Sequence, residues 1–108
     1  MNIVLRPQRD LDIKGASILQ QKVFGLLPVQ EESCWVIDMV QVNFINHFGL
    51  TSLIAVRQAA RQYGCRLYLL NLKQPVLFML EITGLDKEFE ILESLDAAFN
   101  SKIRLLLC

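Results

Sequence analysis

Two short apolar runs in the sequence are typical of strands in the interior of a parallel sheet. Residues 34–39 read Cys-Trp-Val-Ile-Asp-Met, and residues 66–71 read Arg-Leu-Tyr-Leu-Leu-Asn. Neither run alternates between apolar and polar residues, so both faces of each strand are expected to be buried. Because parallel strands require long crossover connections, these runs favour an α/β fold.

Helical periodicity fills the intervals between the apolar runs. Four helices are expected, over residues 14–27, 47–63, 75–83 and 95–100. Their ends carry residues that stop or cap a helix, namely Pro28, Gly64, Gly84 and, at the start of the last one, Ser94. Strands are expected at residues 2–6, 34–39, 66–71 and 88–92, and residues 103–107 are apolar enough to return to the core.

The predicted architecture is one α/β domain over residues 1–108, with a mixed, mostly parallel sheet of about four strands and about four helices. A chain of 108 residues suffices for one hydrophobic core and is short for two. The hydrophobic fraction of 53% and the charged fraction of 20% exclude a disordered or low-complexity chain.

Charge and cysteine content exclude several function classes. Eleven basic and eleven acidic residues give a net charge of +0, which lacks the basic field of a nucleic-acid-binding protein and makes a protein partner or self-association more plausible. Cys34, Cys65 and Cys108 lack metal-ligand spacing and fit a reducing cytoplasm. No apolar run is long enough to span a membrane. We expect a cytoplasmic protein with no metal, no cofactor and no membrane or nucleic-acid partner.

The turn over residues 42–50, VNFINHFGL, joins a buried strand to a helix through the polar pair Asn46 and His47. The free amides of a helix's first turn attract anions, and ligands of α/β proteins often bind there. A nucleotide or anion site is therefore one hypothesis, although the chain has no Gly-rich phosphate loop. A purely structural turn is the other.

Residues 42–50 resemble the turn of STAS domains, the anti-sigma-factor antagonist family, whose pattern is V-x-F-[ILM]-D-[ST]-[ST]-G-L. Residues 75–89, PVLFMLEITGLDKEF, are similar to the family's third-helix motif, which ends in E-[LIM]-[ST]-G-L and leads into the last strand. Residues 9–12, RDLD, resemble more weakly the G-x-[LI]-D loop before the first helix. The likeness covers nearly the whole chain, in order.

The resemblance implies a small domain with helices largely on one face of its sheet, acting in bacteria as a non-catalytic regulatory module in signalling and transcription. In partner-switching members, an anti-sigma factor kinase phosphorylates the serine after the motif aspartate, and a phosphatase reverses this. A phosphate adds about two negative charges at the interface and abolishes docking by repulsion and desolvation. The implied partner is therefore such a kinase or phosphatase.

The sequence departs from the family pattern at the positions that matter for switching. Asn46 stands at the motif aspartate, His47 at the phosphoacceptor and Phe48 at the next hydroxyl, while Gly49 and Leu50 agree with the pattern. A serine kinase finds no acceptor at the usual place, and imidazole does not imitate phosphoserine. The protein is predicted to behave as permanently unphosphorylated.

His47 is the only histidine, so a catalytic triad or a multi-histidine metal site would have to be built around it. No partner for such chemistry is evident, and no catalytic residue or enzyme activity is expected. A structural or capping role and a direct partner contact both stay open for His47. Thr51 and Ser52 are either alternative phosphoacceptors or ordinary helix residues.

The predicted docking surface combines the turn, the exposed side of the following helix and an apolar patch. Its residues are Asn46, His47, Phe48, Gly49, Leu50, Arg57, Leu77 and Phe78. Residues 76–80 are five apolar residues in a row, more than one buried face can hold, so Leu77 and Phe78 are either exposed or covered by the last segment of the chain. Arg57 and Arg61 either meet an acidic partner or form a solvated face.

Three further interpretations stay open. Asp10 and Asp12 can be interpreted as a carboxylate pair or a cation site, but no further acidic residues follow at a suitable spacing, and Asp12 is better explained as the N-cap of the first helix. We expect that the extra strand that many relatives carry before residues 2–6 is missing, which would leave a sheet edge open. The alternative functions are a nucleotide- or anion-binding regulatory domain and a self-associating assembly subunit.

Overall fold

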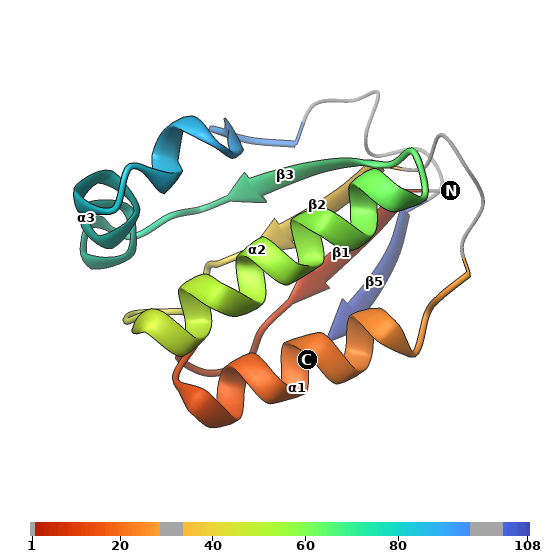
Figure 1. The fold of residues 1–108 in the computed structure, drawn as a ribbon, viewed down its shortest axis with the longest axis horizontal. Helices are drawn as coiled ribbons and strands as arrows, with labels where there is room; N and C mark the ends of the chain where they lie inside the picture. The colour runs from red at the N-terminus through yellow and green to blue at the C-terminus, as the bar shows by residue number, and fades with distance from the viewer. Residues whose placement is uncertain (1, 29–33, 96–102) are drawn as a thin grey trace.

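The computed structural model describes residues 2–28, 34–95 and 103–108. Within these ranges the chain alternates strands and helices, as Figure 1 shows. In chain order the elements are β1 (Asn2–Arg6), α1 (Ile13–Phe24), β2 (Cys34–Asp38), α2 (His47–Gln62), β3 (Arg66–Leu70), α3 (Gln74–Ile82), the 3-10 helix η1 (Leu85–Lys87), β4 (Glu90–Leu92) and β5 (Ile103–Leu107).

The strands form one sheet in the order β4-β3-β2-β1-β5, and every pairing in it is parallel. The predicted α/β class is confirmed, with five parallel strands in place of a mixed sheet of about four. The additional strand is β5, which pairs with β1 at the edge predicted to be open. One row across the sheet aligns Leu105, Val4, Val36 and Tyr68.

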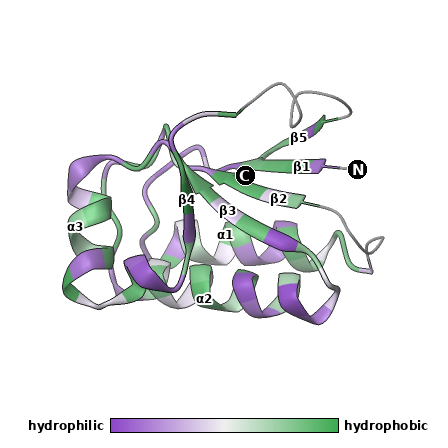
Figure 2. Ribbon diagram, turned by 90° about the horizontal axis from the view of Figure 1, so that it is seen from above, coloured by the Kyte–Doolittle hydropathy of each residue, from purple (hydrophilic) through white to green (hydrophobic). Residues whose placement is uncertain are grey.

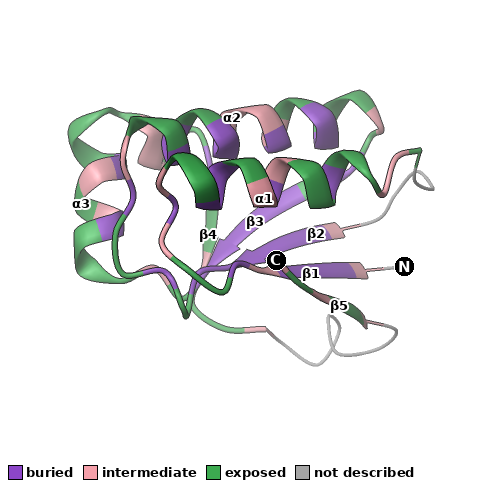
Figure 3. Cartoon of the chain, turned by 90° about the horizontal axis from the view of Figure 1, so that it is seen from below, coloured by how far each residue is buried: buried purple, intermediate pink, exposed green. Residues whose placement is uncertain are grey.

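Helices α1 and α2 lie side by side on one face of the sheet, whereas α3 lies beyond the carboxyl ends of the strands (Figures 2 and 3). The main core fills the space between the two helices and the sheet, where Trp35, Ile37 and Leu69 are fully buried. A smaller cluster on the opposite face contains Val4, Val36, Tyr68 and Leu70. Both faces of the central strands are thus buried, which explains their unbroken apolar runs.

The predicted helix boundaries hold where a local capping residue determines them. The Asp12 carboxylate accepts a hydrogen bond from the Gly15 amide, 2.9 Å away, and so caps α1 as expected. Gly64 and Gly84 adopt the left-handed conformation after α2 and α3. Helix α1 ends at Phe24, three residues before the predicted end, because its C-cap is Gly25 rather than a residue next to Pro28.

Two other expectations concern the last third of the chain. The predicted strand at residues 88–92 is shorter, because η1 precedes it and Glu88 caps that turn. The helix expected near residues 95–100 falls on a stretch that, from residue 96 on, lies outside the described residues.

Among the described helices, none combines the length and apolarity needed to cross a bilayer.

Candidate functional site

The turn before α2 begins with a side-chain cap. Asn46 Oδ1 accepts hydrogen bonds from the amides of Phe48 at 3.0 Å and Gly49 at 3.2 Å. The N-cap is therefore Asn46, and the capping role considered for His47 belongs to its neighbour. These two amides are among the donors that an anion at this helix N-terminus would use. The cap thus competes directly with a nucleotide or anion at this position.

His47 and Phe48 present adjacent rings to solvent on the first turn of α2. Their ring centroids lie 4.0 Å apart with the planes tilted by 36°, and both residues are exposed. The next two residues, Gly49 and Leu50, are buried. Within the predicted docking turn, the imidazole and the phenyl ring are the groups that a partner could touch, and the last two residues hold the helix in place.

The loop that leads into this turn is clamped by the loop between β1 and α1. Asp10 Oδ1 accepts hydrogen bonds from the amides of Asn43 at 2.8 Å and Phe44 at 3.2 Å. The backbones of Leu11 and Phe44 and of Leu11 and Asn46 are also hydrogen-bonded. Two loops separated by about thirty residues therefore form one unit, so the exposed rings stand on a preorganised support.

A second polar cluster ties together the carboxyl ends of three strands. The buried Asp38 carboxylate accepts hydrogen bonds from Arg6 Nε and Asn71 Nδ2, each at 2.9 Å, and from the Val40 amide at 3.1 Å. Charged and neutral donors together compensate the burial of this carboxylate. The cluster holds together the carboxyl ends of β1, β2 and β3, which is the end of the sheet where the turn before α2 lies.

Helix α3 lies at the same end of the molecule as the first turns of α1 and α2 (Figure 1). Lys73, the residue before α3, donates a hydrogen bond to the Asn43 side chain in the clamped loop. Phe78 is 59% exposed, so the alternative that later residues cover it is wrong. Leu77 is half-buried and lines a hollow beside β4. Of this predicted apolar pair, Phe78 is the one that faces solvent.

Other exposed apolar side chains at this end were not predicted from the sequence. Phe44 is exposed in the clamped loop, and Ile13 is exposed at the first position of α1. Phe44 matches an apolar position of the family pattern, which gave no indication of its exposure. We use the name carboxyl-end surface for five of the exposed side chains at this end, Ile13, Phe44, His47, Phe48 and Phe78.

The two hydroxyl residues of α2 differ in accessibility. Ser52 is fully buried, and its hydroxyl donates to the Gly49 carbonyl at 2.6 Å. Thr51 is exposed, and its hydroxyl donates to the His47 carbonyl at 2.8 Å. A kinase could reach the Thr51 hydroxyl without unfolding the helix, whereas the Ser52 hydroxyl lies in the core.

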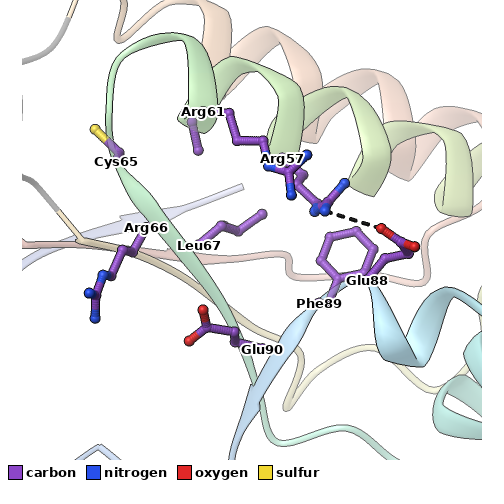
Figure 4. A pocket seen from close by; sticks show the side chains of 9 residues that line it. Arg57, Arg61, Cys65, Arg66, Leu67, Glu88, Phe89 and Glu90 are labelled. Atoms are coloured by element: carbon purple, nitrogen blue, oxygen red, sulfur yellow. Dashed lines mark hydrogen bonds and ion pairs between the residues drawn. The ribbon is translucent and has the colours of Figure 1, made fainter.

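Arg57 lies ten residues after His47, about 15 Å along the helix axis. Figure 4 shows its guanidinium reaching Glu88, with a nitrogen–oxygen distance of 3.2 Å. The same guanidinium stands 5.8 Å from the centre of the Phe89 ring. Together with Arg61 these residues line a hollow of about 200 Å³. Arg57 stays a predicted partner contact, but to bind a partner it would have to share or open its pair with Glu88.

The described residues contain no group of three or more potential metal-ligating side chains from His, Cys, Asp and Glu. His47 has an aromatic neighbour, Phe48, and the Thr51 hydroxyl donates a hydrogen bond to the His47 backbone carbonyl rather than to the imidazole. The arrangement offers apolar contact area and a single imidazole. Exposed apolar and aromatic groups of this kind are common in protein–protein interfaces.

Comparison with known proteins gives one family match and two instructive structural neighbours. A family model, described as the STAS domain, matches residues 1–98. The fold is similar to that of a candidate anti-sigma factor antagonist from Thermotoga maritima, with a TM-score of 0.75 and 22% identity over 89% of this chain and 83% of that one. It is also similar to a sulfate transporter family protein from Wolinella succinogenes, with a TM-score of 0.63 and 16% identity over 83% of this chain and 75% of that one. At these identities the likeness is one of fold.

Proposed function

Because the chain belongs to the STAS domain family, we propose that it is a non-catalytic regulatory domain that docks a protein partner through its carboxyl-end surface. The observation that carries the proposal is the pair of exposed aromatic rings, Phe44 and Phe48, on a turn held by the Asp10 clamp and the Asn46 cap. Exposed aromatic side chains on a rigid support are typical of the centre of protein–protein interfaces.

Rigidity of the support favours docking for a physical reason. A partner that binds a mobile loop must offset the entropy of ordering it, and this lowers the affinity. Here the loop residues Asn43 and Phe44 are already held by Asp10, and the start of α3 is joined to Asn43 through Lys73. Binding therefore orders few groups beyond the exposed side chains themselves.

The partner class we propose is an anti-sigma factor kinase, with the domain acting as an antagonist that is insensitive to phosphorylation. Its support is the family membership together with His47 at the position where switching members carry a phosphorylated serine. Imidazole accepts no phosphate from a serine kinase, and Ser52 is buried. The docking state would then be permanent unless Thr51 is modified.

Charge introduced on the surface tests the docking proposal. The variants Phe48→Asp and Phe78→Asp place a carboxylate on the carboxyl-end surface, and Phe24→Asp places one at the opposite end of α1, where Phe24 is 49% exposed. We expect the first two to weaken binding to a purified anti-sigma factor kinase by about tenfold or more, with unchanged binding for the control. Equal affinities of all three variants, with circular dichroism showing intact folds, would contradict the docking surface.

A further inference from the structure

Strand β5 is the last strand on one side of the described sheet. It pairs with β1 on one side, and among the residues that the structure describes no strand pairs with its other side. Four of its five residues are apolar, and Leu105 and Leu107 are 46% and 54% exposed. A free, apolar edge of this kind is a template for pairing with another strand. Figure 2 shows β5 at the margin of the sheet.

The hydrogen bonds of the chain beyond β5 establish which backbone groups face outward. The Cys108 amide donates to the Arg6 carbonyl, and the Cys108 carbonyl accepts from the Gln8 amide, so residue 108 directs both groups toward β1. In a parallel ladder, alternate residues point to the same side. Residues 104 and 106 therefore bond β1, and the amides and carbonyls of Ile103, Leu105 and Leu107 point to the free edge.

The opposite edge of the sheet differs in the properties that govern pairing. Strand β4 has three residues, and an exposed glutamate, Glu90, lies within it. Two more exposed glutamates, Glu88 and Glu93, flank it. Short length and acidic side chains are the usual protection of a sheet edge against pairing. Strand β5 carries one charged residue, Arg104, and no acidic residue or proline.

We propose that two copies of this chain associate by antiparallel pairing of their β5 strands about a two-fold axis at Leu105. In this arrangement Leu105 faces Leu105 of the second copy, and Ile103 faces its Leu107. The three residues that point outward on each strand are then those that form hydrogen-bonded pairs, with two bonds in each pair. One continuous ten-stranded sheet results, because each copy contributes five strands.

Side chains favour a second copy as the occupant of this edge. Leu105 aligns with Val4 on the face that carries the smaller apolar cluster, so Leu105 and Leu107 would extend that cluster across the axis. Arg104 would stand opposite Leu106 of the second copy instead of another arginine. The net charge of +0 adds no long-range repulsion between copies.

The association is independent of the docking function proposed above. Strand β5 lies beyond residues 1–98, which match the family model, and its free edge is on the β1 side of the sheet rather than at the carboxyl-end surface. A failure of the β5 pairing would therefore leave the docking proposal standing. A loss of docking would likewise leave the pairing intact.

Sedimentation velocity of the full chain between about 5 and about 200 µM tests the proposal. We expect the wild-type mass to rise with concentration from 12.4 kDa toward twice that value. Leu105→Lys places a charge on the axis and is expected to remain monomeric throughout. The matched control is Ile91→Lys on β4, where Ile91 is 41% exposed, and it is expected to associate like the wild type.

Two outcomes would overturn the proposal. The first is a wild-type chain that stays monomeric at the highest concentration, and the second is a folded Leu105→Lys variant that dimerises as the wild type does. If circular dichroism shows that Leu105→Lys is unfolded, hydrogen exchange of the wild-type chain is the measurement that tests the β5 pairing. Protection of the Leu105 and Leu107 amides must then increase with concentration, and exchange that is independent of concentration refutes the pairing.

Discussion

The Leu11 carbonyl oxygen lies so close to Gly49 that a Cβ atom on residue 49 would come within 3.0 Å of it. The loop after β1 and the first turn of α2 thus meet backbone to backbone. This contact explains why a glycine is required three residues after the Asn46 cap, although the backbone there is helical. The clamped turn therefore depends on the lack of a side chain at Gly49 as well as on its hydrogen bonds.

Gly49→Ala should destabilise the domain, even though alanine is a better helix former than glycine. The new methyl group would collide with the Leu11 carbonyl and with the Ile45 side chain, so we expect a loss of about 1 to 3 kcal/mol in the free energy of unfolding. Urea unfolding measures the change. Gly25→Ala is the comparison, because its φ of −70° is ordinary and its Cβ would meet the Gln21 carbonyl oxygen at 3.1 Å, a milder contact than the collisions at residue 49. Equal effects at both positions would refute the close-contact explanation.

Asn46 should contribute to stability through its side-chain oxygen. Asn46→Ala removes the acceptor for the amides of Phe48 and Gly49 and should lower the free energy of unfolding by about 1 kcal/mol. Asn46→Asp keeps the acceptor and adds a negative charge at a helix N-terminus, so stability should stay level or rise by about 0.3 to 1 kcal/mol. Chemical denaturation of the two variants provides the test, and a destabilised aspartate variant would count against the capping role.

Asp12 should make stability depend on pH in acid. The Gly15 amide, which donates to its carboxylate, holds the pKa of Asp12 below its ordinary value of 3.8, with a smaller contribution from the Arg9 guanidinium. A lowered folded-state pKa stabilises the protein above the unfolded pKa, and this stabilisation is lost as the pH falls through the folded pKa. Asp12→Asn retains a cap without the charge. The difference in Tm between wild type and variant should be constant above about pH 5 and shrink below 3.8. A difference that widens on acidification would contradict this assignment.

Arg57 should stabilise the packing of η1 and β4 against α2. Its side chain is 19% exposed, pairs with Glu88 and lies over the Phe89 ring, so Arg57→Ala should cost about 1 kcal/mol. Arg61→Ala, on the same helix face and exposed, should change stability by less than about 0.5 kcal/mol. Thermal melts of both variants compare the two residues. Indistinguishable melting temperatures would show that the ion pair contributes nothing measurable.

Much of the fold could be predicted from local sequence. The apolar run at residues 34–39 predicts β2, because a strand that is buried on both faces has an unbroken run of apolar residues. The apolar stripe between residue 47 and Gly64 predicts α2, because a helix that is buried on one face has apolar residues at helical spacing. The position of β5 could not be predicted in this way. Strand order is determined by packing between distant segments, and an apolar run such as residues 103–107 does not specify which strand it joins.

The site was predicted less completely than the fold. The motif around Asn46 and His47 locates the turn, but the sequence indicates Asp10 only as one member of a carboxylate pair or cation site. Its hydrogen bonds to the Asn43 and Phe44 amides span more than thirty residues of sequence, and no local pattern indicates them. The exposure of Phe44 was missed for a related reason, since an aromatic residue in a motif is indistinguishable in sequence from one in the core.

The central claim is that this domain docks an anti-sigma factor kinase without being switched by it. Its most direct test measures the affinity of wild type and His47→Ser for the purified kinase with ADP and with ATP, together with phosphate incorporation by mass spectrometry. We predict that wild type binds equally under both conditions and gains no phosphate, whereas His47→Ser is phosphorylated at the introduced serine and loses affinity with ATP. Wild-type binding that weakens with ATP while phosphate appears on Thr51, or an absence of binding by both proteins, would contradict the account.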